Sequence, residues 1–91
     1  MLPVEWSDEA QFDLADIQGY IEQSSPQAAH TLRRSIETGV ERLPHMPYVF
    51  RPGRVAGTRE YVVHPNYIVV YRVTSSAIVV DRVLHTRQEY P

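Results

Sequence analysis

The sequence predicts an α+β domain in which a helical hairpin packs across one face of a mainly antiparallel, twisted sheet. Three runs rich in β-branched and aromatic residues follow one another after Gly57, which is typical of an antiparallel meander. Two amphipathic helical segments precede this meander, and a short apolar run precedes the helices. The expected element order is therefore β-α-α-β-β-β, within a single domain that spans residues 1–91.

The chain begins with a short strand and a helix. In Leu2–Trp6 apolar residues alternate with Glu5, which favours a first strand. Ser7 can cap the free N–H groups of a helix, and the acids Asp8 and Glu9 then lie at the positive end of the helix dipole. Apolar residues recur at helical spacing as far as about residue 23: Ala10, Leu14, Ile17 and Ile21.

A second helix follows after a short break. Ser25 is a natural N-cap and Pro26 suits the first helical position, while Pro44 stops the helix. Its apolar stripe consists of Ala29, Leu32, Ile36, Val40 and Leu43. Because the break is short, the two helices form an antiparallel hairpin, and Gly19 in the first predicts a close crossing with the second.

Segment 44–56 contains three prolines and Gly53, so it is expected to be an irregular connector. We expect the apolar residues at its centre, Tyr48, Val49 and Phe50, to attach it to the core. Arg51 and Arg54 are expected to be solvated or functional.

The meander contains three predicted strands, 59–63, 67–73 and 77–84. Proline cannot adopt the positive φ of a type I′ turn, so Pro65-Asn66 predicts a type I turn with a bulge. Both faces of 67–73 carry apolar residues, which places this strand centrally in the sheet. Polar groups crowd where the last strand ends, at Arg82, His85, Arg87 and Tyr90.

Composition limits the classes of function. The chain has no cysteine and no apolar run that approaches 18 residues, and its start lacks the features of a signal peptide. A cytoplasmic protein without a membrane partner is expected. The net charge is −2, with −5 on residues 1–48 and +3 on residues 49–91, and all nine basic side chains are arginine. The basic half could meet phosphate or an acidic protein surface.

Metal and cofactor sites are not expected. The four histidines, His30, His45, His64 and His85, have neither the i, i+4 pairing nor the spacing of metal ligands. No glycine-rich loop precedes a helix, and no serine lies in a nucleophile elbow.

Phosphodiester cleavage is a possible chemistry. It needs a cation for the phosphate and groups that move protons. The cations could come from Arg59, Arg72, Arg82 and Arg87, and the proton carriers from Glu60, His64, His85 and Tyr90. The alternative is that these arginines are solvated or paired across the sheet.

Three segments resemble the RelE/ParE superfamily of bacterial type II toxins, and the resemblance covers essentially the whole chain. They are Gly57-Thr-Arg-Glu, the hairpin from His64 to Val73, and the ending from Val83 to Pro91. They are most similar to the ParE branch, whose members are often labelled plasmid-stabilisation proteins.

The resemblance implies a toxin neutralised by a cognate antitoxin, which wraps it and adds a helix or strand to its surface. ParE relatives block DNA gyrase without catalysis of their own, whereas RelE relatives cut mRNA in the ribosomal A site. The chain lacks lysine and has a negative net charge, which favours the non-enzymatic gyrase inhibitor over the ribosome-dependent endonuclease. A non-toxic relative that only binds its antitoxin is a third possibility.

The residues expected to bind the target lie toward the sheet end: Arg59, Arg82, His85, Arg87 and Tyr90. If the protein were a nuclease, the resemblance would give the catalytic set as Arg59, His85, Arg87 and Tyr90.

Overall fold

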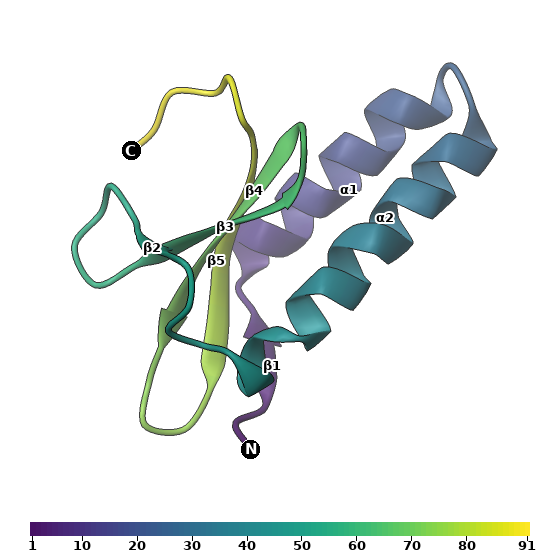
Figure 1. Cartoon of the computed structure of the whole chain (residues 1–91). Coiled ribbons are helices and arrows are strands. Elements are labelled where there is room, and N and C mark those ends of the chain that lie inside the picture. The colour runs from purple at the N-terminus through teal and green to yellow at the C-terminus, as the bar shows by residue number, and fades with distance from the viewer.

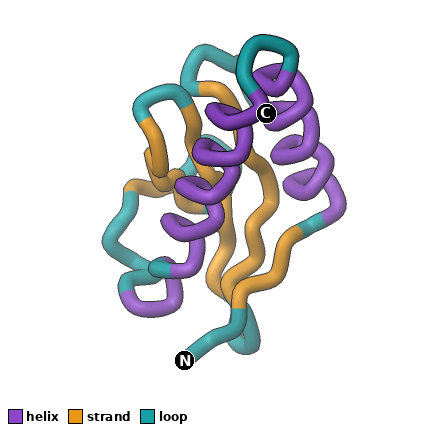
Figure 2. The backbone as a smooth tube through the Cα atoms, turned by 90° about the vertical axis from the view of Figure 1, so that its right-hand side faces the viewer, coloured by secondary structure: helices purple, strands orange, loops and turns teal.

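The computed structural model describes all 91 residues, and two helices lie on one face of a five-stranded sheet (Figures 1 and 2). Helix α1 spans Asp8–Glu22 and helix α2 spans Pro26–Glu41. They form the predicted hairpin, and a short 3₁₀ helix, η1 (Leu43–His45), follows α2. The predicted α+β class and the order of its main elements are confirmed.

The strands are β1 (Val4–Trp6), β2 (Arg51–Pro52), β3 (Arg59–His64), β4 (Tyr67–Val73) and β5 (Ile78–His85). Their order in the sheet is β1-β5-β4-β3-β2, so β4 is central as predicted. Strand β1 runs parallel to β5, and all other neighbours are antiparallel. The predicted connector therefore contains one element that the sequence analysis missed, the two-residue strand β2.

Both helices begin where the serine caps predict. The Ser7 hydroxyl oxygen accepts the amide of Ala10 at 3.0 Å, and that of Ser25 accepts the amide of Ala28 at 3.1 Å. Each bond satisfies one of the N–H groups that a helix leaves unpaired at its start. The two caps thus set the starting points of the hairpin.

The main core lies between the hairpin and the sheet, with the fully buried Tyr71 at its centre. Helix residues Leu14, Ile36 and Val40 belong to this core together with buried residues of β4 and β5. A second, smaller apolar cluster lies on the opposite face of the sheet and consists of Ile68, Val70 and Leu84. Strand β4 is consequently covered on both faces.

The bulge predicted beside the turn between β3 and β4 is present. The pairing register shifts between Val62 and His64, which marks a bulge, and no residue other than glycine has a positive φ. The predicted attachment of the connector is only partly right. Phe50 stacks on Tyr61 with ring centroids 4.1 Å apart, but Tyr48 and Val49 are 65% and 71% exposed.

The expected close crossing at Gly19 is wrong. A Cβ atom added at Gly19 would meet nothing within 4 Å, because this position faces solvent. The helical glycine that does permit close packing is Gly39, where an added Cβ would collide with Cγ2 of Val63. Gly39 therefore lets α2 approach β3 rather than α1.

No helix of the structure has the length and apolarity required to cross a membrane.

Candidate functional site

The face of the sheet that the helices leave uncovered carries the small cluster of Ile68, Val70 and Leu84, and the chain end folds back over it. After β5 the chain turns, and Tyr90 packs against this cluster. This face also presents most of the arginines of the second half. A functional site is therefore expected on this face.

A buried carboxylate, Glu60, organises one side of this face. Glu60 is only 4% exposed. Its Oε1 lies 2.9 Å from Nη2 of Arg51, and its Oε2 accepts hydrogen bonds from the Arg54 amide at 3.3 Å and from the Tyr90 hydroxyl. The Arg54 guanidinium also lies over the Tyr90 ring, 4.6 Å from its centroid. One carboxylate thus ties together β2, the loop that follows it and the chain end.

This arrangement shifts the pKa values of both acids. Burial alone would raise the pKa of Glu60, but hydrogen bonds from Tyr90, Arg54 and Arg51, together with the Arg51 charge, lower it overall. Burial and the hydrogen bond to Glu60 raise the pKa of the Tyr90 hydroxyl to about 12. Glu60 is therefore charged and Tyr90 neutral at physiological pH, and neither is poised to exchange a proton there.

The remaining arginines of this face are also paired with carboxylates. Arg82 donates to both oxygens of Asp13, at 2.8 and 3.1 Å, and lies 3.6 Å from Glu9. Arg72 donates to both oxygens of Asp81, at 2.8 and 3.0 Å. Hydrogen bonding and charge raise the pKa of each guanidinium further, so both stay ionised. Four arginines, those at 51, 54, 72 and 82, are therefore compensated within the chain.

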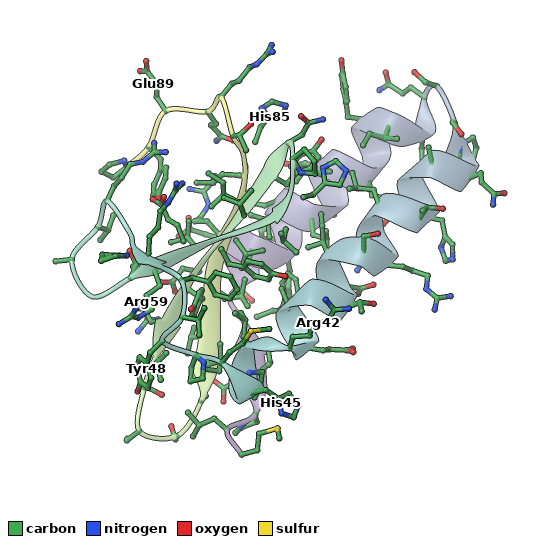
Figure 3. The ribbon with its side chains drawn as sticks, in the orientation of Figure 1. Arg42, His45, Tyr48, Arg59, His85 and Glu89 are labelled. Atoms are coloured by element: carbon green, nitrogen blue, oxygen red, sulfur yellow. The ribbon has the colours of Figure 1, made fainter.

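The five residues expected to bind the target do not converge on one point. Arg59 lies at the start of β3 opposite Tyr71, whereas His85 lies at the far end of the sheet opposite Tyr67 (Figure 3). Arg82 and Tyr90 line a common cavity of about 300 Å³ on the open face. Arg82 and His85 line a different cavity of about 400 Å³ beside α1.

The surroundings of these residues also differ. Arg59 donates to the carbonyl oxygens of Tyr48 and Phe50 and to no carboxylate. His85 packs edge-on against Tyr67, and its Nδ1 accepts the amide of Arg87 at 3.1 Å. The Arg87 side chain is exposed and forms no ion pair.

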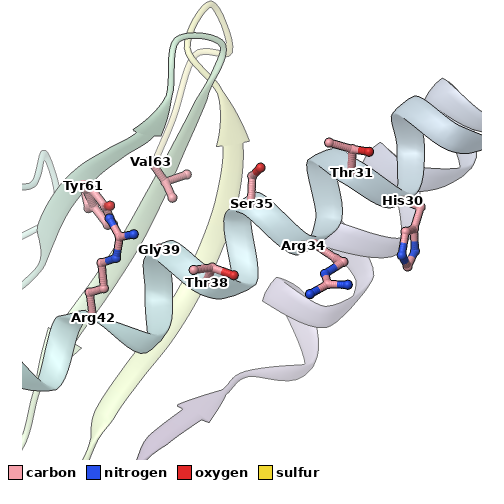
Figure 4. A pocket seen from close by; sticks show the side chains of 9 residues that line it. All are labelled: His30, Thr31, Arg34, Ser35, Thr38, Gly39, Arg42, Tyr61 and Val63. Atoms are coloured by element: carbon pink, nitrogen blue, oxygen red, sulfur yellow. The ribbon is translucent and has the colours of Figure 1, made fainter.

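Helix α2 and β3 enclose the largest groove, of about 500 Å³ (Figure 4). It combines three basic side chains with four hydroxyl groups and contains no carboxylate; its lining is His30, Thr31, Arg34, Ser35, Thr38, Gly39, Arg42, Tyr61 and Val63. Strand β2 pairs only with the first two residues of β3, so 61–64 form a free edge beside the groove. Such an edge can accept an added strand.

This groove was not predicted from the sequence. Its signal was the series Arg34, Thr38 and Arg42, which recurs every four residues along the exposed side of α2. The structure contains no group of three or more histidines or acids that could hold a metal ion.

Comparison with known proteins shows the family. A model of the ParE toxin of type II toxin–antitoxin systems matches residues 4–90. This chain belongs to the ParE toxin family. Its relatives include the protein Y4kP of Sinorhizobium fredii, 35% identical over 89 residues, which cover 97% of this chain and 92% of the relative. Toxin RelE2 of Caulobacter vibrioides is 34% identical over 87 residues, covering 93% and 96% of the two chains.

Solved structures share the ParE fold. A chain of the chromosomal ParDE system of P. aeruginosa superposes with a TM-score of 0.84 at 24% identity, covering 93% of this chain and 96% of that one. A chain of the E. coli DinJ–YafQ complex has a TM-score of 0.66 at 16% identity, with 93% of each chain covered. The protein is therefore a type II toxin of the ParE/RelE superfamily by family and by fold.

Proposed function

We propose that this ParE-family toxin arrests growth in the cytoplasm by binding and inhibiting DNA gyrase, and that a cognate antitoxin neutralises it. The proposal that the toxin inhibits gyrase, rather than cleaving RNA, rests on one observation. Four arginines are paired with carboxylates of the same chain: Arg51, Arg54, Arg72 and Arg82. These arginines are held as structural ion pairs. They do not form an uncompensated positive site.

A nuclease of this fold would need different electrostatics on the open face. Cleavage of a phosphodiester requires cations that are free to stabilise the negative charge that develops on the phosphate. Here Glu60 already occupies Arg51 and Arg54, and the Tyr90 hydroxyl donates its hydrogen bond to the same carboxylate. Binding to a protein target needs no such catalytic arrangement, which favours inhibition by contact.

The antitoxin half of the proposal rests on the groove between α2 and β3. Arg34 and Arg42 line it without an ion-pair partner, and the free edge of β3 lies beside them. An acidic, extended segment would satisfy both features, with its main chain on β3 and its carboxylates on the arginines. The solved structures of the ParDE system and of the DinJ–YafQ complex are described with partners, which supports an antitoxin partner here.

The test uses the purified toxin in two reactions. It should inhibit supercoiling by purified gyrase and accumulate cleaved DNA complexes, and preincubation with the antitoxin should restore activity. A translation reaction that contains ribosomes and a defined mRNA should show no codon-dependent cleavage. Cleavage of that mRNA, with gyrase unaffected, would replace this proposal by the ribosome-dependent endonuclease. Inactivity in both reactions together with tight antitoxin binding would favour a non-toxic relative.

A further inference from the structure

The connector between η1 and β2 presents two consecutive apolar side chains to solvent, those of Tyr48 and Val49. They are 65% and 71% exposed. Single exposed apolar side chains are common on protein surfaces, but contiguous ones often mark an interaction site. We call this pair the 48–49 knob; Figure 3 labels Tyr48 on the loop below β2.

The backbone that carries the knob is held on both sides. Before the knob, the hydroxyl of the buried Tyr71 donates to the carbonyl oxygen of Pro47 at 2.7 Å. After it, Phe50 stacks on Tyr61, and Arg51 and Pro52 pair with β3 as strand β2. The exposure of Tyr48 and Val49 therefore does not result from a loose loop. A loop already fixed in shape loses less entropy when a partner binds it.

Arg59 lies against the knob and fixes it further. Its Nη1 donates to the carbonyl oxygens of Phe50 at 2.8 Å and of Tyr48 at 3.2 Å. The guanidinium also lies over the Tyr48 ring, 5.1 Å from the centroid, in a cation–π arrangement. The same arginine thus orients both the main chain and the aromatic ring.

The charge around the knob is positive. Arg59 has no carboxylate partner, in contrast to the four paired arginines of the open face. The neighbouring Arg51 side chain, although it contacts Glu60, is 57% exposed. A partner surface that receives the knob would therefore be complementary if it were apolar at its centre and acidic at its rim.

We propose that this toxin binds its target protein mainly through the 48–49 knob, which inserts into an apolar pocket of the target that is bordered by carboxylates. This inference rests on the proposed function, since it names the contact through which gyrase would be inhibited. Tyrosine and arginine are the residue types that most often dominate binding energy in protein interfaces. The knob combines them on a fixed backbone, with Val49 filling the pocket beside the ring.

The experiment compares Tyr48→Ala, Val49→Ala and the control Tyr20→Ala in the supercoiling reaction and in growth arrest after induced expression. Tyr20 is 74% exposed on α1, so its replacement also removes an exposed tyrosine. Loss of a dominant interface residue costs roughly 30-fold in affinity or more, so Tyr48→Ala should inhibit gyrase at least ~30-fold less well. Val49→Ala should show a smaller loss, Tyr48→Phe should retain inhibition, and Tyr20→Ala should resemble the wild type.

Folding and antitoxin affinity of each variant are measured alongside, and both should stay unchanged because the knob is exposed and lies outside the α2–β3 groove. Inhibition and growth arrest by Tyr48→Ala at wild-type levels would overturn the inference. An equal loss of gyrase inhibition in Tyr20→Ala would overturn it too. So would a Tyr48→Ala variant that loses antitoxin binding but keeps its toxicity. Failure of the wild type itself to inhibit gyrase would instead refute the proposed function, and growth arrest would still decide the role of the knob.

Discussion

Asp13 of α1 and Arg82 of β5 are joined by a two-point ion pair across 69 residues of sequence, with Nε–Oδ2 and Nη2–Oδ1 distances of 2.8 and 3.1 Å. Oδ2 also accepts the amide of Val83 at 2.9 Å. Strand β1 pairs with β5 only as far as Val80, so Asp13 supplies the acceptor that a longer β1 would have offered to Val83. One side chain therefore links helix α1 to both the main chain and a side chain of β5.

Replacing Asp13 with alanine should destabilise the protein, because it leaves the amide of Val83 and the half-buried guanidinium of Arg82 without their acceptor. Such losses cost about 1–3 kcal/mol each for a buried group, and about 2 kcal/mol in total is expected here because Arg82 is partly solvated. Urea denaturation measures the free energy of unfolding. The control is Asp16→Ala, an exposed acid of the same helix, which should change stability by less than about 0.5 kcal/mol. Equal effects of the two variants would contradict the role assigned to Asp13.

Tyr90 should titrate at unusually high pH. Its pKa is raised to about 12, so the stabilisation that it provides is complete below the ordinary pKa of 10 and is lost as the pH rises through 12. Ultraviolet absorbance of the six tyrosines follows their ionisation. The difference between the wild type and Tyr90→Phe should isolate a group that ionises near pH 12. A difference curve centred near pH 10 would show that Tyr90 does not bind Glu60 in solution.

Acid stability should depend on Glu60 in the opposite direction. Because the pKa of Glu60 is lowered from its ordinary 4.5, the stabilisation is present above that pH and is lost as the pH falls through the lower folded-state value. Tyr90→Phe removes one donor to the carboxylate, so the pKa of Glu60 should rise and acid unfolding should begin at higher pH. Thermal unfolding measured from pH 6 to pH 3 tests this, with Tyr20→Phe as the control. If the melting temperatures of the wild type and Tyr90→Phe fell in the same way between pH 6 and pH 3, this prediction would be refuted.

The two helical glycines should respond oppositely to alanine. Gly39→Ala forces a Cβ onto Val63 and should destabilise by about 1–3 kcal/mol, as overpacking does. Gly19→Ala meets no atom and should stabilise by up to about 1 kcal/mol through helix propensity. Chemical denaturation of both variants shows whether each substitution raises or lowers the free energy of unfolding. Stabilisation by Gly39→Ala would mean that α2 and β3 are further apart than described.

Reversing the charge of the α2–β3 groove should weaken antitoxin binding. The double variant Arg34→Glu, Arg42→Glu should lose at least ~10-fold in affinity, because like charges that face each other across an interface cost several kcal/mol and about 1.4 kcal/mol already corresponds to tenfold. Titration calorimetry at low and high salt measures the affinity for the antitoxin. The affinity of the wild type should fall as the salt concentration rises. Arg87→Glu, which changes charge outside the groove, should bind normally. Unchanged affinity of the double variant would place the antitoxin on another surface.

The fold was predictable because its determinants are local. Ser7 and Ser25 cap the helices on which they were expected to act, and the alternation in 67–73 placed β4 with both faces covered. The features of the fold that were not predicted share a cause, because each depends on residues that are distant in the sequence. Strand β2 is too short to have a periodicity, and whether Gly19 or Gly39 is packed depends on where Val63 lies.

The candidate site was less predictable for the same reason. Arginine was recognised as the important residue type, but the sequence does not say which carboxylate each arginine meets. The hydrogen bond between Glu60 and Tyr90 spans 30 residues. The apolar character of Tyr48 and Val49 argued for burial, yet Arg59 and Tyr71 hold their backbone at the surface. Only the three-dimensional arrangement separates compensated charges from free ones.

The parallel pairing of β1 with β5 has a consequence for synthesis. Val4 lies opposite Ile78, and the Ser7 hydroxyl donates to the carbonyl oxygen of Asp81, 74 residues along the chain. The amino-terminal strand therefore has no partner until nearly the whole polypeptide has left the ribosome, and contacts of such long range form late. A prematurely terminated product would lack its last strand, so growth-inhibiting activity should be acquired only after translation is complete.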